Sequence, residues 1–285
     1  MHKSGLRFGV TAAIPLVFLM VFLVAPIVLV FRSSLSDPAA SGAGVSLFQY
    51  IRFFSDSYYL SVLADTVLFG LITALLSIVI GFPIGYSLAR LPPKQRRWRL
   101  LLVIIPLSLS LVVIVFGWLV LLGRGGLLND VLLWLSLIDR PQRFLFTRGA
   151  LLAVLLQEFL PFMILSVMSV VSQIDPVLEH ASASLRADRY TTFRKVILPM
   201  AAPGIVSGAT LVFILAVSSF ITPEIIGGNK IQMLGSTIYA QVLTVLDWPF
   251  AASMSFVLLA ITLLVVALTN RVFKPLLSVG VNRAN

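Results

Sequence analysis

The stretch TVLFGLITALLSIVIGFPIGYSLA, from Thr66 to Ala89, contains no charged residue. An α-helix needs about 20 consecutive apolar residues to cross the hydrocarbon core of a bilayer, so this stretch is long enough to span a membrane. The composition of the whole chain agrees, because 59% of its residues are hydrophobic and 11% are charged. Soluble domains carry about 25% charged residues. The sequence therefore predicts an integral membrane protein built from helices.

Six stretches of the chain have the length and composition of a membrane span. Five are free of charge and the sixth is interrupted only by Glu158; they are Phe8–Phe31, Thr66–Ala89, Leu100–Gly123, Val196–Pro223, Trp248–Asn270 and Gly149–Ile174. We predict an all-α integral membrane protein with a single transmembrane domain over residues 1–285. Its six spans are expected near residues 10–31, 63–89, 100–122, 149–172, 200–221 and 249–270.

Two apolar stretches need a separate interpretation. The first span, Phe8–Phe31, is longer than the about 7–15 residues of a signal-peptide core, which indicates a retained membrane anchor. The segment Leu127–Ile138 is apolar at helical spacing but short, and it contains Asp130. We therefore predict that it forms a surface helix lying against the bundle.

The distribution of basic residues predicts the orientation of the spans. The segments 1–7, 90–99, 175–195 and 271–285 hold 14 of the 21 lysines and arginines. Basic residues accumulate on the cytoplasmic side of membrane proteins. This favours an N-in, C-in orientation, with residues 175–199 in the cytoplasm.

The stretch LEHASASLRADRYTTFRKVILP, from Leu178 to Pro199, is a long polar interruption in the apolar second half of the chain. Asp175 and Pro176 before it are typical of a helix N-cap and first helical position. Helical spacing of apolar residues with a break near Ala187–Asp188 predicts two short helices. Two functions fit these residues: docking into a groove on another protein, or a solvated inner loop that follows the charge rule.

This stretch resembles the cytoplasmic coupling loop of ABC importer permeases. The pattern of the family is Glu-Ala-Ala, three residues, Gly, nine residues, Ile, one residue and Leu-Pro. Ala181, Leu198 and Pro199 match it, whereas Glu179–His180 stand at the glutamate and Arg186 at the turn glycine. Glycine adopts the left-handed conformation at little cost and arginine does not, so we expect a reshaped turn or a bend at the next residues. The resemblance implies that the residues contacting the ATPase are Glu179, His180, Ala181, Ser182, Leu185, Arg186, Val196, Leu198 and Pro199.

Other segments resemble the spermidine/putrescine-type permeases of the same family. They are GFPIGYSLAR (Gly81–Arg90), IIPLSLSLVVIVFGWLVLLGRGGLLN (Ile104–Asn129), LPFMILS (Leu160–Ser166) and FITPEIIGG (Phe220–Gly228). In that subfamily the last segment reads Phe-x-Thr-Pro-x-x-x-Gly-Gly. The resemblance implies a type I ABC importer permease fold in a bacterial inner membrane. It also implies three kinds of partner: an ATPase dimer in the cytoplasm, a second permease, with a different chain favoured, and a periplasmic or extracellular substrate-binding protein.

The sequence contains no motif for ATP hydrolysis and no group of residues at metal-ligand spacing. No segment reads Gly-x-x-x-x-Gly-Lys-Ser/Thr, so no phosphate-binding loop is present to hold ATP. There are no cysteines, and neither of the two histidines has a carboxylate at ligand spacing. We expect no enzyme activity, no metal and no cofactor in this chain, with ATP and Mg²⁺ bound by the partner ATPase.

Polar residues within or next to the spans are candidates for the route of the substrate. Glu158 lies well inside a span, where an ionisable group tends to face a cavity, and Gln157 precedes it. Glu158 is either the countercharge of a cationic substrate or a structural hydrogen-bonding group. Trp118 is either a packing residue or a cation–π surface. Thr222, Pro223 and Glu224 follow the fifth span, as an outer gate, a docking surface or a simple turn.

The basic segment RLPPKQRRWR, Arg90–Arg99, lies between two predicted spans. Basic residues beside an aromatic one superficially suit nucleic acid. Contact with lipid phosphates and an orientation signal explain the segment better in a membrane protein. We therefore predict a bilayer contact and no nucleic-acid partner.

The sequence and the resemblance together predict the permease subunit of an ATP-driven importer for a polyamine or an amino-acid-derived cation. An importer of aminophosphonates, opines or sugars is the alternative within the family. A secondary carrier is the alternative outside it, but such a protein is expected to show inverted repeats and several intramembrane ion ligands.

Overall fold

The computed structural model describes residues 4–36 and 44–281. Within these residues the regular secondary structure is helical, apart from one isolated β-bridge between Ser36 and Val45. The α-helices are α1 (Ser4–Ser34), α2 (Phe48–Ser55), α3 (Ser57–Arg90), α4 (Pro93–Ile104), α5 (Leu111–Leu122), α6 (Leu127–Trp134), α7 (Arg148–Val171), α8 (Val177–Ser184), α9 (Arg189–Thr192), α10 (Leu198–Ser218), α11 (Leu234–Ala240) and α12 (Trp248–Val281). Short 3₁₀ or π turns occupy Ile105–Ser108, Phe193–Ile197, Pro223–Gly227, Gly228–Lys230 and Gln241–Val245. The predicted all-α class is confirmed.

Five segments within the described residues are long and apolar enough to cross a membrane. They are Ser57–Arg90, Leu111–Trp134, Arg148–Val171, Arg189–Ser218 and Trp248–Phe273. Helix α1 covers the first predicted span. The total of six spans, the N-in, C-in orientation and the single domain stay predictions.

The chain divides into two compact units. One contains the described parts of Met1–Ser61 together with Ile238–Ala260, and the other contains Val62–Thr237 together with the described part of Ile261–Asn285. In the first unit Phe53 and Phe250 are fully buried, and Tyr59 packs on both rings. Arg52 forms an ion pair with Asp247 over an Nη1–Oδ2 distance of 2.7 Å, and its guanidinium lies 4.0 Å from the centre of the Phe250 ring. These contacts join α2 to the beginning of α12.

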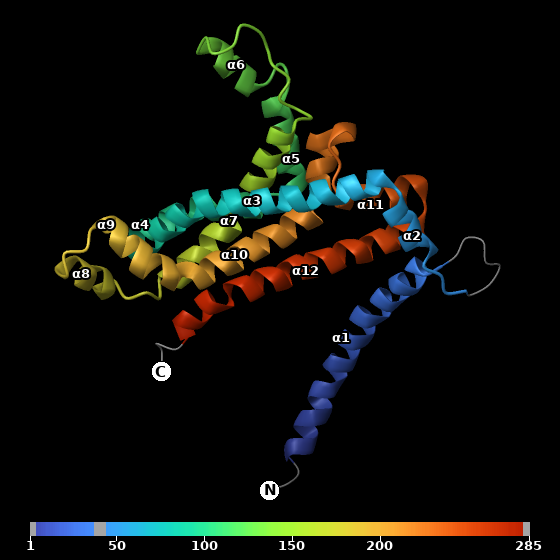
Figure 1. The fold of residues 1–285 in the computed structure, drawn as a ribbon, viewed down its shortest axis with the longest axis horizontal. Helices are drawn as coiled ribbons and strands as arrows, with labels where there is room; N and C mark the ends of the chain where they lie inside the picture. The colour runs from blue at the N-terminus through green and yellow to red at the C-terminus, as the bar shows by residue number, and fades with distance from the viewer. Residues whose placement is uncertain (1–3, 37–43, 282–285) are drawn as a thin grey trace. The chain divides into compact units, whose positions relative to one another are not determined.

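The second unit is built around α7, α10 and the part of α3 that belongs to it, which run side by side (Figure 1). Glycines spaced four residues apart bring their backbones together: Gly204 and Gly208 on α10, and Gly81 and Gly85 on α3. A Cβ added at Gly208 would lie 2.9 Å from Met163 Sδ, and one added at Gly81 would lie 2.7 Å from Met163 Cγ. Membrane helices use such spacing to pack closely, because lipid provides no hydrophobic force that drives them together.

The predicted span at residues 100–122 is not one continuous helix. Helix α4 ends at Ile104, a 3₁₀ turn follows, Leu109 is extended, and α5 begins at Leu111. Pro106 accounts for the break, because proline has no N–H to donate and its ring clashes with the preceding helical turn. Hydropathy does not indicate this break, whereas Pro106 is a signal of it that the sequence contains.

The segment predicted to form a surface helix is helical, as α6, although the helix ends at Trp134 rather than at Ile138. It packs on α5. The buried Asn129 side chain fixes its beginning, since its Nδ2 donates hydrogen bonds to the carbonyl oxygens of Gly123 and Gln142. Its Oδ1 accepts a hydrogen bond from the Gln142 N–H.

Candidate functional site

The loop of residues 175–199 folds into the two short predicted helices, α8 and α9. Helix α8 begins at Val177, one residue later than Asp175 and Pro176 suggested, and the Asp175 Oδ1 accepts a hydrogen bond from the Val177 N–H. Residues 185–188 separate α8 from α9, which confirms the expected break.

The turn after α8 keeps the geometry that glycine usually provides. Arg186 has φ of 60°. The Ala187 N–H donates to the Ser182 carbonyl and the Arg186 N–H donates to the Ala183 carbonyl. This pair of bonds is a Schellman motif, in which the residue after the helix is left-handed. Arg186 therefore takes the conformation that the family pattern assigns to glycine, and the bend does not move to the next residues.

One side of this loop presents apolar side chains that nothing in the described chain covers. Leu185 is 84% exposed, and Leu178, Val177 and Tyr190 are also exposed. Leu178, Ala181 and Leu185 recur at helical spacing, so they lie on one face of α8. Among the residues predicted to contact the ATPase, four others are also exposed: His180, Ala181, Arg186 and Leu198. We call Leu178, Ala181 and Leu185 the α8 apolar face.

Glu179 and Ser182 do not belong to this exposed face, because both bind to the chain itself. Glu179 Oε1 lies 2.6 Å from Arg90 Nη2, and its Oε2 accepts a 2.8 Å hydrogen bond from the Tyr86 hydroxyl. Arg90 Nη1 also donates to the Ile174 carbonyl. The contacts of Glu179 with Arg90 and Tyr86 connect α8 to the C-terminal end of α3.

The other members of the predicted coupling set lie where α9 leads into α10. The Ser182 hydroxyl lies 2.9 Å from the Thr192 hydroxyl, which joins α8 to α9. Val196 is half-buried within the π turn Phe193–Ile197, and Pro199 is the second residue of α10. Proline is tolerated there because the first turn of a helix has no partner for its N–H groups.

Arg90 and Tyr86 are partners of Glu179 that no sequence pattern predicts. The basic segment that contains Arg90 predicts only a cytoplasmic position for it, and the two sides of the contact are far apart in the chain. Only the packing of α3 against the 175–199 loop brings them together.

Arg90→Gln is expected to loosen α8 from α3. Both charged side chains are partly exposed, so we expect a loss of stability between that of surface and buried ion pairs, at about 1–2 kcal/mol. This corresponds to a rise of roughly 5- to 30-fold in the population of molecules whose 175–199 loop is detached from α3. The rate of trypsin cleavage at Arg186 and Arg189 in the membrane-embedded protein measures this population.

Two variants control that experiment. Arg97→Gln removes a basic residue that has no ion pair among the described residues, and it should leave the cleavage rate unchanged. The exchange Arg90→Glu with Glu179→Arg should restore slow cleavage, because it restores the pair. Equal cleavage of Arg90→Gln and the unmodified protein would contradict the role of the contact.

The intramembrane candidates form two adjacent polar pairs. Gln157 Oε1 accepts a 2.9 Å hydrogen bond from the Trp118 Nε1–H, which joins α5 to α7. Glu158 Oε2 accepts a 2.8 Å hydrogen bond from the Thr222 hydroxyl, which joins α7 to the segment after α10. The structure thus brings together four of the six predicted route residues. Glu158 lies near the middle of α7.

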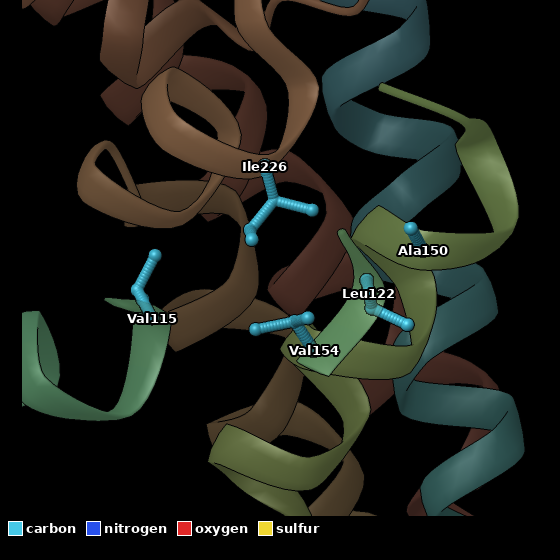
Figure 2. Packing of buried hydrophobic residues seen from close by; sticks show 5 residues of the cluster. All are labelled: Val115, Leu122, Ala150, Val154 and Ile226. Carbon is cyan, nitrogen blue, oxygen red and sulfur yellow. The ribbon is translucent and has the colours of Figure 1, made fainter. Parts of the chain in front are cut away.

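A cluster of buried apolar residues holds these pairs in place. Figure 2 shows its members Val115, Leu122, Ala150, Val154 and Ile226, which come from α5, α7 and the Pro223–Gly227 turn. Trp118 packs against the same cluster. The apolar contacts therefore align the three elements that supply the polar pairs.

The remaining two route candidates have different surroundings. Pro223 is buried at the beginning of the π turn Pro223–Gly227, whereas the Glu224 side chain is exposed. Glu224 has no described contact with Glu158. Next to this turn, Gly228 has φ of 56°, and a Cβ added to it would lie 2.7 Å from the Phe146 ring.

Gly228→Ala is expected to destabilise the protein, whereas Gly227→Ala is not. The backbone at Gly228, with φ of 56° and ψ of −153°, is almost restricted to glycine and costs another residue about 1–3 kcal/mol. The Phe146 ring must also move. At Gly227 the nearest atoms to an added Cβ are 3.5 Å away or more, which is ordinary contact. Thermal unfolding of the detergent-solubilised variants measures the difference. Equal unfolding temperatures for the two alanine variants would contradict this account.

These features define a class of protein. Several membrane-spanning helices, an acidic side chain in the middle of one of them, and an amphipathic loop with an uncovered apolar face are the features of a membrane transport permease.

Comparison with known proteins gives the family. Residues 81–276 match the model for the inner membrane component of binding-protein-dependent transport systems. The chain is 36% identical over 203 residues to the spermidine/putrescine transport system permease protein PotB of Escherichia coli, covering 71% of this chain and 74% of that protein. It is 30% identical over 268 residues to PotB of Haemophilus influenzae, covering 92% and 93%. A crystal structure of a bacterial ABC transporter that imports alginate matches with a TM-score of 0.77 at 17% identity, over 96% of both chains.

The chain belongs to the family of binding-protein-dependent transport system inner membrane components. It is the permease subunit of an ABC importer, a multi-pass protein of the bacterial inner membrane, and not an enzyme. The likeness to the alginate transporter agrees with the predicted permease fold.

Proposed function

We propose that this chain forms half of a translocation route for polyamines, with Glu158 as a countercharge on that route. The names of the relatives with 30–36% identity support the substrate class. Polyamines carry alkyl amines, which are protonated at neutral pH as lysine is. A route for such cations needs acidic or aromatic groups inside the membrane, where charge is otherwise expensive.

The observation that carries the proposal is the arrangement around Glu158. Thr222 donates to one carboxylate oxygen, while the other, Oε1, has no hydrogen-bond donor among the described residues. The Glu158 side chain is half-buried, so it is not fully enclosed by other residues. One oxygen is therefore held in position and the other is free to pair with a substrate ammonium. The indole of Trp118, fixed through Gln157, provides an aromatic surface from the neighbouring pair.

The energy for transport comes from partners in this proposal. The ATPase dimer binds ATP and Mg²⁺, and it docks on the α8 apolar face. A second permease subunit with a different sequence provides the other half of the route. Closure of the ATPase dimer pushes on the 175–199 loop, and the Arg90–Glu179 contact and the short link into α10 transmit this movement to the helices.

Uptake by the reconstituted importer tests the substrate class. Proteoliposomes that contain the permease pair and ATPase receive the binding protein outside and ATP inside, with radiolabelled spermidine or putrescine as substrate. We expect saturable, ATP-dependent uptake of polyamines, and no competition from an opine, an aminophosphonate or a sugar. Uptake of one of these competitors in place of polyamines would overturn the substrate assignment, and uptake without nucleotide would overturn the dependence on an ATPase.

A further inference from the structure

Helix α4 carries four basic residues at its beginning, Lys94, Arg96, Arg97 and Arg99, and an apolar run at its end, Leu100–Ile104. None of these basic residues forms an ion pair within residues 4–36 and 44–281. A helix that changes from basic to apolar along its axis is suited to the boundary between water and lipid. Trp98, near the end of the basic part, is 69% exposed, and tryptophan is enriched at this boundary.

The basic residues of α4 divide between two faces of the helix. Successive residues are about 100° apart, because an α-helix has 3.6 residues per turn. Lys94, Arg97 and Trp98 therefore share one face, while Arg96 and Arg99 point to the opposite side. An open cleft of about 630 Å³, formed by residues of α4 alone, lies on the first face. The residues that line it are Pro93, Lys94, Arg97, Trp98 and Leu101.

We propose that this cleft binds the headgroup of an acidic phospholipid. Lys94 and Arg97 contact the phosphate, and an acyl chain follows Trp98 and Leu101 toward the apolar end of α4. Each basic residue near an anionic leaflet strengthens binding by about fivefold, and an arginine forms two parallel hydrogen bonds with a phosphate.

A lipid fits this face better than an acidic protein partner does. The charged part of the face continues directly into apolar side chains, with Leu101 and Leu102 both exposed. A phospholipid has the same succession of a charged headgroup and an apolar chain within one molecule. An acidic protein surface would match Lys94 and Arg97 but not the exposed leucines that follow.

Lipid retention by the purified full-length chain tests the site. The chain is purified from nanodiscs of phosphatidylcholine alone or mixed with phosphatidylglycerol, and native mass spectrometry measures the bound lipid. We expect phosphatidylglycerol to be retained, and Lys94→Gln with Arg97→Gln to weaken its binding by about tenfold or more. The matched control, Arg96→Gln with Arg99→Gln, removes the same charge from the other face and should retain the lipid.

Three results would overturn the proposal. Equal losses in the two double variants would mean a diffuse attraction of charge rather than a site. Unchanged retention in the first double variant would mean that the lipid binds elsewhere. A photo-crosslinker at Trp98 that captures another importer subunit instead of lipid would mean that a protein covers this face. These outcomes are independent of the substrate and of Glu158.

Discussion

Leu185→Asp is expected to abolish ATP-dependent uptake while the protein still inserts into the membrane. Leu185 is the most exposed member of the α8 apolar face, and its backbone φ of −80° is one that aspartate adopts readily. No buried contact within the described chain depends on its side chain, so the permease itself should remain folded. In the assembled importer the aspartate would be buried without a partner, which costs several kcal/mol, or roughly a hundredfold or more in docking.

The measurement combines uptake by the reconstituted importer with co-purification of the ATPase and membrane abundance of the permease. Ser184→Asp is the matched control, because it adds the same charge one residue earlier without removing apolar surface. Ala181→Trp tests the same face by bulk rather than charge and should also abolish transport. Normal uptake with Leu185→Asp would show that the ATPase does not dock on this face.

Glu158→Gln is the second variant with a large expected effect. Glutamine keeps an oxygen that accepts from the Thr222 hydroxyl, so the link between α7 and the segment after α10 survives. The negative charge is lost, and removing one partner of a desolvated charge pair costs about 2–5 kcal/mol. We therefore expect at least about a thirtyfold fall in the efficiency of polyamine uptake.

Thr222→Val separates the charge from the hydrogen bond. It removes the donor to Glu158 but leaves the carboxylate, so uptake should fall much less than with Glu158→Gln. Thermal unfolding of both variants shows whether either change acts through stability. Unchanged affinity and rate with Glu158→Gln would remove this residue from the substrate route and leave it as a structural group.

Local sequence patterns were sufficient for the membrane class and for much of the 175–199 loop. Hydropathy over about 20 residues identifies a span without any knowledge of its neighbours. The break between α8 and α9 follows from the residues around Ala187–Asp188 themselves. Arg186 is instructive, because the spacing of the family pattern placed the turn correctly even though the residue at the turn is not glycine.

The packing of distant segments decided the rest. Glu179 meets Arg90, Gln157 meets Trp118, and Glu158 meets Thr222 across long stretches of chain. No periodic pattern in the sequence relates such partners. Each contact depends on the distance between two helices and on their relative position along their axes. The same holds for the two sides of α8, of which one is exposed and apolar and the other is bound to α3 through Glu179. The sequence shows which side chains are apolar or charged, but only the tertiary structure shows which of them other residues cover.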